Sequence, residues 1–535
     1  MSALAGTGGL VRLALRRDRI TLPIWILFLG LLPTNFAAAS RELYATAAER
    51  LLYARTTGNN PTFLALYGPL NDTGIGGIVA QRSGFTPVIV GLLCALTVIR
   101  HTRTEEEAGR RELLGAAVVG RGAALASALL VACAASALTG LVVALGMTGL
   151  GLDARGSLAL GLQFALAGWV FAAVAGVAAQ LSESAATARG IAVAALGASF
   201  AVRLAADVGG PGNGLSWLSW LSPLGWGTRL APYGDELWWA ALPALVLTAA
   251  LVAVAAVLSQ GRDVGAGIVP PRPGPAKASP RLRGAFSLAW RLHSRPLWGW
   301  LAGFAALGLV FGGVAGGVQE MLADDPDLAE VFERFGGTTG GVTDVYFTGV
   351  MSVTGLVAAG YAVSATLRMR AEETALRAEP LLATTVGRLR WAASHLAFAL
   401  AGSAAALAVT GLTTGLTHGL GDGDVAGQVP RLTGAALVQL PAVWLLAAVA
   451  VAFFGLLPRL SSAGWAALAV AGALTMFGGM LRADQWLLDV SPFTHVPKLP
   501  GAEVDAVPLA WLAAAALVLC TAGLAGFRRR DLATG

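Results

Sequence analysis

The chain has 535 residues, of which 56% are hydrophobic and only 13% are charged, and its formal net charge is +6. Soluble globular domains carry about 25% charged residues, so this composition excludes a soluble protein and indicates one that crosses a membrane several times. The three cysteines lie in apolar runs without metal-binding or disulfide spacing, and we expect them to be buried as small apolar side chains.

Twelve apolar stretches are long enough to form membrane-spanning helices, each of which needs about 20 residues. In chain order they begin near Ile20, Phe85, Gly122, Ser157, Gly190 and Leu237, and then near Leu297, Tyr346, Trp391, Leu432, Trp465 and Val507. A Pro- and Arg-rich segment, residues 261–296, separates the two groups and is predicted to be a cytoplasmic linker. The sequence therefore predicts an all-α polytopic membrane protein with two parallel, pseudo-symmetric six-helix halves, residues 1–260 and 297–535.

The start of the chain has a second interpretation. It shows the charged beginning, apolar middle and small-residue end of a signal peptide. However, the segment Leu13–Trp25 has a related segment in the second half, Leu288–Trp300. This correspondence favours a first span that is retained.

Basic residues predict the orientation, because they gather in cytoplasmic connections. If the N-terminus, the even-numbered connections, the linker and the C-terminus share one side, that side holds 26 of the 37 Arg and Lys residues and 11 of the 31 acidic residues, a net charge of +15. The opposite side then carries −9. We therefore expect a multi-pass protein of the plasma membrane with both termini in the cytoplasm.

A charged cassette occurs twice, after the second span as Arg103–Arg121 and after the eighth as Arg370–Arg388. The two copies align without gaps, and eleven of their nineteen residues are identical. A single charged loop between spans is ordinary. Its recurrence at the same point of each half instead predicts a surface helix that is presented twice to a twofold partner.

This pattern resembles the permeases of type-two ABC exporters, which carry a cytoplasmic run of the form Glu-x-Gly-Thr-Leu-Glu-x-Leu-Leu that ends in Pro-Val-Ser-Arg. The segments Glu107–Leu114 and Glu373–Arg388 are similar to it, although Arg110 and Arg111 replace Thr-Leu in the first copy. The whole chain looks like two such six-span permeases fused, as in exporters of polyketide antibiotics of the tetronasin type.

The resemblance implies a separate ABC ATP-binding subunit, present as two copies or as a pair of different chains. It would receive two coupling helices, Arg103–Leu114 and Arg370–Leu381. The residues expected to serve this contact are the charged members of the two helices: Arg103, Glu105, Glu106, Arg110, Glu112, Arg370, Glu372, Glu373, Arg377 and Glu379. The family also implies amphipathic elbow helices near Leu10–Arg19 and Phe286–Arg295, at the lipid headgroups.

ATP hydrolysis is not expected on this chain. A phosphate-binding loop requires Gly-x4-Gly-Lys followed by Ser or Thr, and the sequence contains no Gly-Lys dipeptide. We therefore expect no cofactor and no catalytic or metal centre here, with ATP and Mg²⁺ bound by the partner subunit. Nucleic acid is not expected as a partner.

Few polar residues fall within the spans. Asn35, Gln163 and Gln439 are the candidates for a substrate pathway, although a hydrogen bond between helices would serve the two glutamines equally well. Arg203 and Asp207, four positions apart on one span, are placed to form an ion pair. So sparsely polar a pathway suits a small hydrophobic or amphipathic substrate such as a drug or antibiotic.

The favoured function is thus the permease of an ATP-driven exporter that moves hydrophobic or amphipathic drugs or antibiotics out of the cell. Twelve spans in two parallel halves also describe an ion-coupled secondary transporter of major-facilitator-like architecture. A membrane enzyme or assembly factor is the third class.

Overall fold

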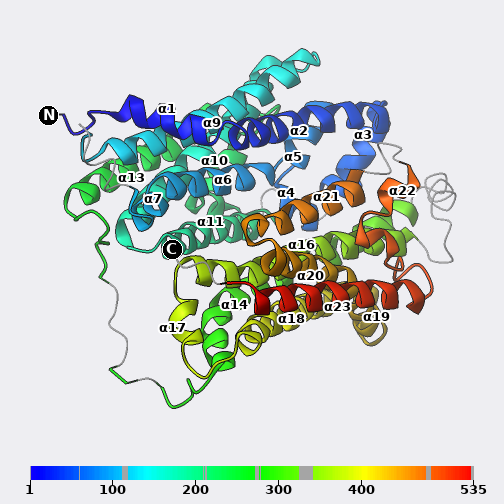
Figure 1. The fold of residues 1–535 in the computed structure, drawn as a ribbon. Helices are drawn as coiled ribbons and strands as arrows, with labels where there is room; N and C mark the ends of the chain where they lie inside the picture. The colour runs from blue at the N-terminus through cyan, green and yellow to red at the C-terminus, as the bar shows by residue number, and fades with distance from the viewer. Residues whose placement is uncertain are drawn as a thin grey trace. The chain divides into compact units, whose positions relative to one another are not determined.

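The computed structural model describes residues 2–59, 61–110, 119–208, 210, 214–270, 276–277, 279–323, 342–477 and 484–531. Within these ranges the regular secondary structure is entirely helical (Figure 1). The chain divides into two compact units, Met1–Gly274 and Pro275–Gly535, and the division falls inside the predicted linker.

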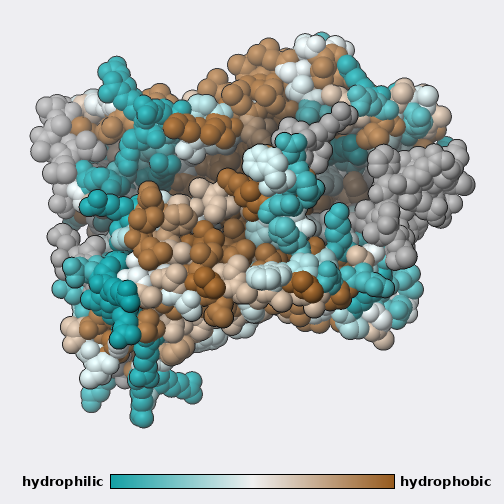
Figure 2. All heavy atoms as spheres, turned by 45° about the vertical axis from the view of Figure 1, so that its right-hand side comes forward, coloured by the Kyte–Doolittle hydropathy of each residue, from teal (hydrophilic) through white to brown (hydrophobic). Residues whose placement is uncertain are grey.

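Ten of the described helices are long and apolar enough to cross a membrane, and a bent helix pair makes up to eleven. The prediction of an all-α polytopic membrane protein is therefore confirmed. Ten of the twelve predicted spans coincide with the ten long helices. Apolar side chains also cover broad areas of the face drawn in Figure 2, as expected for a surface in contact with lipid.

The first unit contains six apolar segments and several short helices on the connections between them. Its helices are α1 (Thr7–Arg17), α2 (Thr21–Leu43), α3 (Ala47–Tyr53), α4 (Pro61–Tyr67), α5 (Ile75–Arg82), α6 (Thr86–His101), α7 (Arg103–Glu107), α9 (Ala123–Gly149), α10 (Ala154–Leu181), α11 (Ala185–Asp207), α12 (Pro223–Arg229) and α13 (Leu242–Gln260). A π-helical turn at Ala54–Gly58 and 3₁₀ turns at Ser216–Leu221 and Trp238–Ala241 complete this set.

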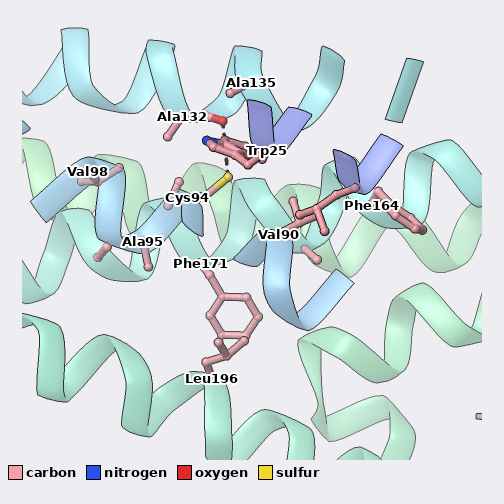
Figure 3. Packing of buried hydrophobic residues seen from close by; sticks show 14 of the residues in the cluster. Trp25, Val90, Cys94, Ala95, Val98, Ala132, Ala135, Phe164, Phe171 and Leu196 are labelled. Carbon is pink, nitrogen blue, oxygen red and sulfur yellow. Dashed lines mark hydrogen bonds between the residues drawn. The ribbon is translucent and has the colours of Figure 1, made fainter. Parts of the chain in front are cut away.

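Helix α10 forms the centre of the first unit, because small residues let its neighbours approach closely. A Cβ on Gly140 of α9 would lie 2.3 Å from the carbonyl oxygen of Gly161 on α10, so the two backbones touch there. In the core shown in Figure 3, Phe171 of α10 lies beside Leu196, and the thiol of Cys94 donates to the carbonyl of Ala132 at 3.5 Å.

The predicted second span corresponds to α6, which forms a bent pair with the preceding helix α5; the two helices meet at 44°. The bend falls at Gly84, where a Cβ would lie 1.7 Å from the carbonyl oxygen of Tyr67. Only glycine permits this close approach, which the apolar pattern alone does not reveal.

The cysteine prediction holds best for Cys94, which is fully buried, whereas Cys133 and Cys520 are half-buried; all three are free thiols.

The second unit has its own core and its own set of helices. These are α14 (Ala285–Ala323), α16 (Val342–Thr374), α17 (Ala378–Leu382), α18 (Arg388–Asp422), α19 (Val425–Leu437), α20 (Leu440–Leu456), α21 (Ala463–Phe477), α22 (Gln485–Leu488) and α23 (Ala506–Arg529), with 3₁₀ turns at Pro458–Leu460 and Pro492–His495. The predicted eleventh span corresponds to α21, which has 15 residues and ends where the described residues stop.

A glycine stripe on α18 sets a close helix contact in the second unit. At Gly411, Gly415 and Gly419, a Cβ would come within 2.5–2.6 Å of Cα atoms of α19. This four-residue spacing places the three glycines on one helix face, where they allow the two backbones to pack directly.

The two predicted elbow helices differ in structure. In the first unit, α1 ends at Arg17 and the chain turns before α2 begins at Thr21. In the second unit, the elbow and the following span form the single helix α14, which has 39 residues and therefore extends for about 58 Å. That is longer than a bilayer core of about 30 Å, so the first part of α14 does not need to lie within the membrane.

Candidate functional site

Neither copy of the charged cassette is one continuous helix over the predicted range. In the first, α7 ends at Glu107 and Gly109 adopts a left-handed φ of 67°. In the second, α16 runs to Thr374, Leu376 adopts a φ of 58°, and α17 then begins at Ala378. A left-handed residue ends a helix because it turns the backbone away from the helical path. Residues 111–118, which include Glu112 and Leu114, lie outside the described residues.

The turn has the same hydrogen bond in both copies. The N–H of Gly109 donates to the carbonyl of Glu106, and the N–H of Leu376 donates to that of Glu373, each at 3.0 Å. We call residues 107–110 and 374–377 the coupling turns. All eight of these residues are exposed, including Leu376, whose exposed fraction is 45%.

The first cassette is fixed to its unit by a buried glutamate that binds two arginines. The Glu106 carboxylate accepts from Arg103 at 2.7 Å and, with both oxygens, from Arg262 at 2.9 and 3.0 Å. The side chains of Arg103 and Glu106 are fully buried. Arg103 also donates to the carbonyl of Ala179 at 2.9 Å, and Arg262 to Oε1 of Gln180 at 2.7 Å. The end of α10 and the segment after α13 are therefore tied to α7.

The second cassette repeats this arrangement with its own residues. The Glu373 carboxylate accepts from Arg370 at 3.2 Å and, with both oxygens, from Arg530 at 2.6 and 2.8 Å. Arg530 directly follows α23, just as Arg262 follows α13 shortly after that helix ends. We call each of these three-residue clusters an inner clamp. In both units, the inner clamp joins the charged cassette to the end of the last apolar helix.

The neighbouring glutamate of each cassette forms a second, outer clamp across the turn. Glu105 accepts from Arg110 through both oxygens, each at 2.8 Å. Glu372 accepts from Arg377 at 2.8 and 3.2 Å. These bonds raise the pKa of Arg110 and the pKa of Arg377 above the usual arginine value, because the carboxylate stabilises the charged guanidinium.

Elements from one end of each unit meet at the clamps. In the first unit, Arg17 at the end of α1 pairs with Glu105 at 2.8 Å. Glu107 accepts from the N–H of Ala185 at the start of α11, at 2.6 Å. In the second, Arg388 at the start of α18 donates to the carbonyl of Arg530 at 2.6 Å. Within each unit, the segments predicted to be cytoplasmic thus lie at a common end.

The structure separates the predicted contact residues into two groups. The paired glutamates 105, 106, 372 and 373 are buried in the clamps, together with Arg103, so their carboxylates are already bound within the chain. Arg110, Arg377 and Glu379 are exposed. Sequence reasoning missed Arg262 and Leu376. The position of an arginine just after the last span of each half was the available signal for Arg262.

The three predicted pathway residues have different surroundings within their own units. Asn35 is exposed on α2. Gln163 is 6% exposed and packs against Gly227 of α12, while Gln439 is 4% exposed and lies against Gly355 of α16. Among the described residues, Oε1 of Gln439 has no hydrogen-bond partner.

Arg203 and Asp207 form the predicted ion pair, at 3.4 Å. The guanidinium also donates to three backbone carbonyls, those of Ala65, Leu66 and Gly84, at 2.7–3.1 Å. Arg203 therefore fastens the segment between the first two spans to α11, which is a structural role.

Comparison with known proteins places these features in a family. Residues 282–528 match the family model described as "Multidrug efflux system permease Rv1217c, C-terminal domain". Over 532 residues, the chain is 44% identical to the "Multidrug efflux system permease protein Rv1217c" of Mycobacterium tuberculosis, an alignment that covers 99% of this chain and 96% of that relative.

Proposed function

Because the chain belongs to the family of multidrug efflux permeases, we propose that it is the transmembrane permease subunit of an ATP-driven ABC exporter. It moves hydrophobic or amphipathic drugs or antibiotics out of the cell across the plasma membrane. ATP and Mg²⁺ are bound by a separate ATP-binding subunit, present as two copies or as a pair of different chains. That subunit contacts the cytoplasmic end of each unit.

The recurrence of one structural device in both units supports this proposal. Each unit has an inner clamp, an outer clamp and an exposed coupling turn built from residues at matching positions. A twofold pair of motor subunits needs two equivalent contact surfaces. The left-handed backbone conformation of Leu376 costs free energy, and its exposed side chain gains little packing within the chain in return. A contact between this side chain and the partner subunit accounts for both features.

The clamps give the turn a means of transmitting movement. A bidentate arginine–carboxylate pair holds both direction and distance. Glu373 joins the end of α16 to the residue after α23, and Glu106 joins α7 to Arg262, two residues after the end of α13. A displacement of either coupling turn is therefore passed to two apolar segments of the same unit.

The sparsely polar interior suits the proposed substrates. The described main cores consist of Ala, Val, Leu, Ile, Phe and Met side chains, together with Trp25 and Cys94. A hydrophobic or amphipathic molecule meets few unpaired polar groups in such surroundings, whereas a strongly polar solute loses its hydration without compensation.

The contact with the ATP-binding subunit is tested by changing Leu376→Asp in the purified full-length chain. The partner to use is the ATP-binding subunit sought in the neighbouring reading frames by its phosphate-binding loop. We expect the variant to lose co-purification with that subunit and to lose drug-stimulated ATP hydrolysis in lipid. Leu460→Asp is the matched control, because Leu460 is 54% exposed in a different connection of the same unit.

Two results would contradict the proposal. One is full binding and ATP-dependent efflux in the Leu376→Asp protein. The other is drug efflux by the wild-type chain in vesicles that lack any ATP-binding subunit but carry a proton gradient, which is the behaviour of a secondary transporter.

A further inference from the structure

A cavity of about 560 Å³ lies between the elbow part of α14 and the second cassette. Its volume is in the range of about 300–1,000 Å³ that small-molecule sites occupy. One wall is the apolar face of the elbow: Ala285, Leu288, Ala289 and Leu292. The opposite wall comes from α17, the residue Val386 and the start of α18, with Arg368, Glu372 and Arg377 among the lining groups.

A cavity of about 320 Å³ occupies the corresponding place in the first unit, between α1 and the first cassette. Its elbow wall is formed by Leu10, Leu13, Ala14 and Arg17, each of which lies 275 positions before one of the four elbow residues of the other cavity. Glu105 and Val119 line it where Glu372 and Val386 line the second. We call the two cavities the elbow pockets.

The charges that line the elbow pockets are alike in number and sign. Each pocket has two arginines and one glutamate: Arg17, Arg121 and Glu105 in the first, and Arg368, Arg377 and Glu372 in the second. Each therefore carries one positive charge in excess. The Nε of Arg368 is buried without a hydrogen-bond partner, at 3.6 Å from its nearest carboxylate oxygen.

The helices that cover the pockets have the character of elements at a membrane surface. On the elbow of α14, Phe286 and Trp290 are 47% and 49% exposed. On α1, Leu13 and Leu15 are 40% and 49% exposed. Amphipathic helices with such residues lie at the boundary between headgroups and acyl chains, so lipid has direct access to a pocket beneath them.

We infer that each elbow pocket binds one anionic phospholipid, with its phosphate at the arginines and an acyl chain along the apolar elbow wall. The excess positive charge selects an anionic headgroup, and the apolar lining excludes a free inorganic anion. A lipid in this position contacts both the elbow and the outer clamp. It therefore links the composition of the surrounding leaflet to the geometry of the coupling turn.

A cavity-filling variant tests the site. At Gly284, which lines the second pocket, a Cβ meets no atom within 4 Å, so Gly284→Phe adds a bulky side chain at the pocket wall without a backbone clash. Gly299→Phe is the matched control, because Gly299 on α14 is exposed and equally open but lies outside the pocket. Arg368→Gln removes one of the lining charges.

The measurement is lipid binding to the full-length chain alone, by native mass spectrometry in detergent with added dioleoylphosphatidylglycerol or dioleoylphosphatidylcholine. We expect the wild type and Gly299→Phe to prefer phosphatidylglycerol, and Gly284→Phe to lose one tightly bound molecule. Arg368→Gln should weaken binding of phosphatidylglycerol about fivefold, which corresponds to one arginine near a lipid surface, and should leave phosphatidylcholine unaffected.

The inference fails if the wild-type chain binds the two lipids equally, or if Gly284→Phe and Gly299→Phe retain the same number of lipids. It also fails if inorganic phosphate displaces phosphatidylglycerol, because the acyl chain then contributes nothing. No ATP-binding subunit is present in this assay, so its outcome is separate from that of the docking experiment.

Discussion

Removal of the charge at the centre of the second inner clamp, by Glu373→Gln, should destabilise the second unit. The Glu373 side chain is 2% exposed and binds two guanidinium groups that are 14% and 23% exposed, those of Arg530 and Arg370. A neutral amide cannot accept the bidentate bond from Arg530 together with the single bond from Arg370, so two positive charges are left facing each other. Breaking one side of a buried ion pair costs about 3–5 kcal/mol. Because both arginines retain some contact with solvent, we expect the lower value, about 3 kcal/mol.

A loss of this size is measurable by thermal unfolding in detergent. For domains of about 150–250 residues, 1 kcal/mol shifts the Tm by about 2–4 °C. The variant should therefore unfold about 6 °C or more below the wild type. Glu379→Gln is the control, since Glu379 belongs to the same cassette but is exposed, and exposed substitutions change stability by no more than about 0.5 kcal/mol.

A second substitution distinguishes the interaction energy of Arg530 with Glu373 from the general effect of losing a carboxylate. If Arg530 and Glu373 act together, Arg530→Gln should cost less in the Glu373→Gln background than in the wild type, by at least about 0.5 kcal/mol. Equal Tm values for Glu373→Gln and Glu379→Gln, or strictly additive effects in the double variant, would refute the clamp.

Three further outcomes are expected. Glu106→Gln should cost more than Glu373→Gln in the same Tm assay, because its clamp is more deeply buried; a smaller loss would contradict this order. Gly415→Leu should destabilise the chain by about 1–3 kcal/mol through its clash with the α19 backbone, whereas Gly421→Leu on open surface of the same helix should be tolerated. Arg203→Met leaves three carbonyls unpaired and should speed limited proteolysis between the first two spans, a change that no other cleavage site should share.

The places of ten of the twelve predicted spans could be read from the sequence, because a bilayer fixes the length of a helix and excludes other backbone structure. The repeated cassette was equally visible. The burial of its glutamates was not, because the arginines that bind them lie far along the chain: Arg262 is 156 residues from Glu106, and Arg530 is 157 from Glu373. From the sequence alone, a charged loop between spans is therefore predicted to be exposed to solvent. Its burial becomes apparent only when the arginine that follows the last span of the same unit is seen to bind it.

The elbows show a second limit of pattern reasoning. In the first unit, Asp18 binds His101 and Arg100 at 2.5 and 3.0 Å, and the chain turns there between α1 and α2. The aligned position in the second unit is His293, which lies within the continuous helix α14. Its ring forms a hydrogen bond of 2.9 Å with His395 of α18. One aligned residue thus makes different long-range contacts in the two units, and the local pattern predicts neither.

Leu376 offers a test in which stability and partner binding change in opposite directions. A left-handed conformation costs an L-residue about 1–2 kcal/mol, while glycine adopts it freely but loses about 0.5–1 kcal/mol more entropy on folding. Because the Leu376 side chain is 45% exposed, it contributes little packing, so Leu376→Gly should stabilise the isolated chain by about 0.5–1 kcal/mol. The same change removes the apolar group that the coupling turn presents, and affinity for the ATP-binding subunit should fall. Unfolding of the chain alone and binding of the purified subunit measure the two effects separately. A more stable variant that binds as tightly as the wild type would mean that the leucine makes no contact with the partner, and a less stable one would mean that it packs within its own unit.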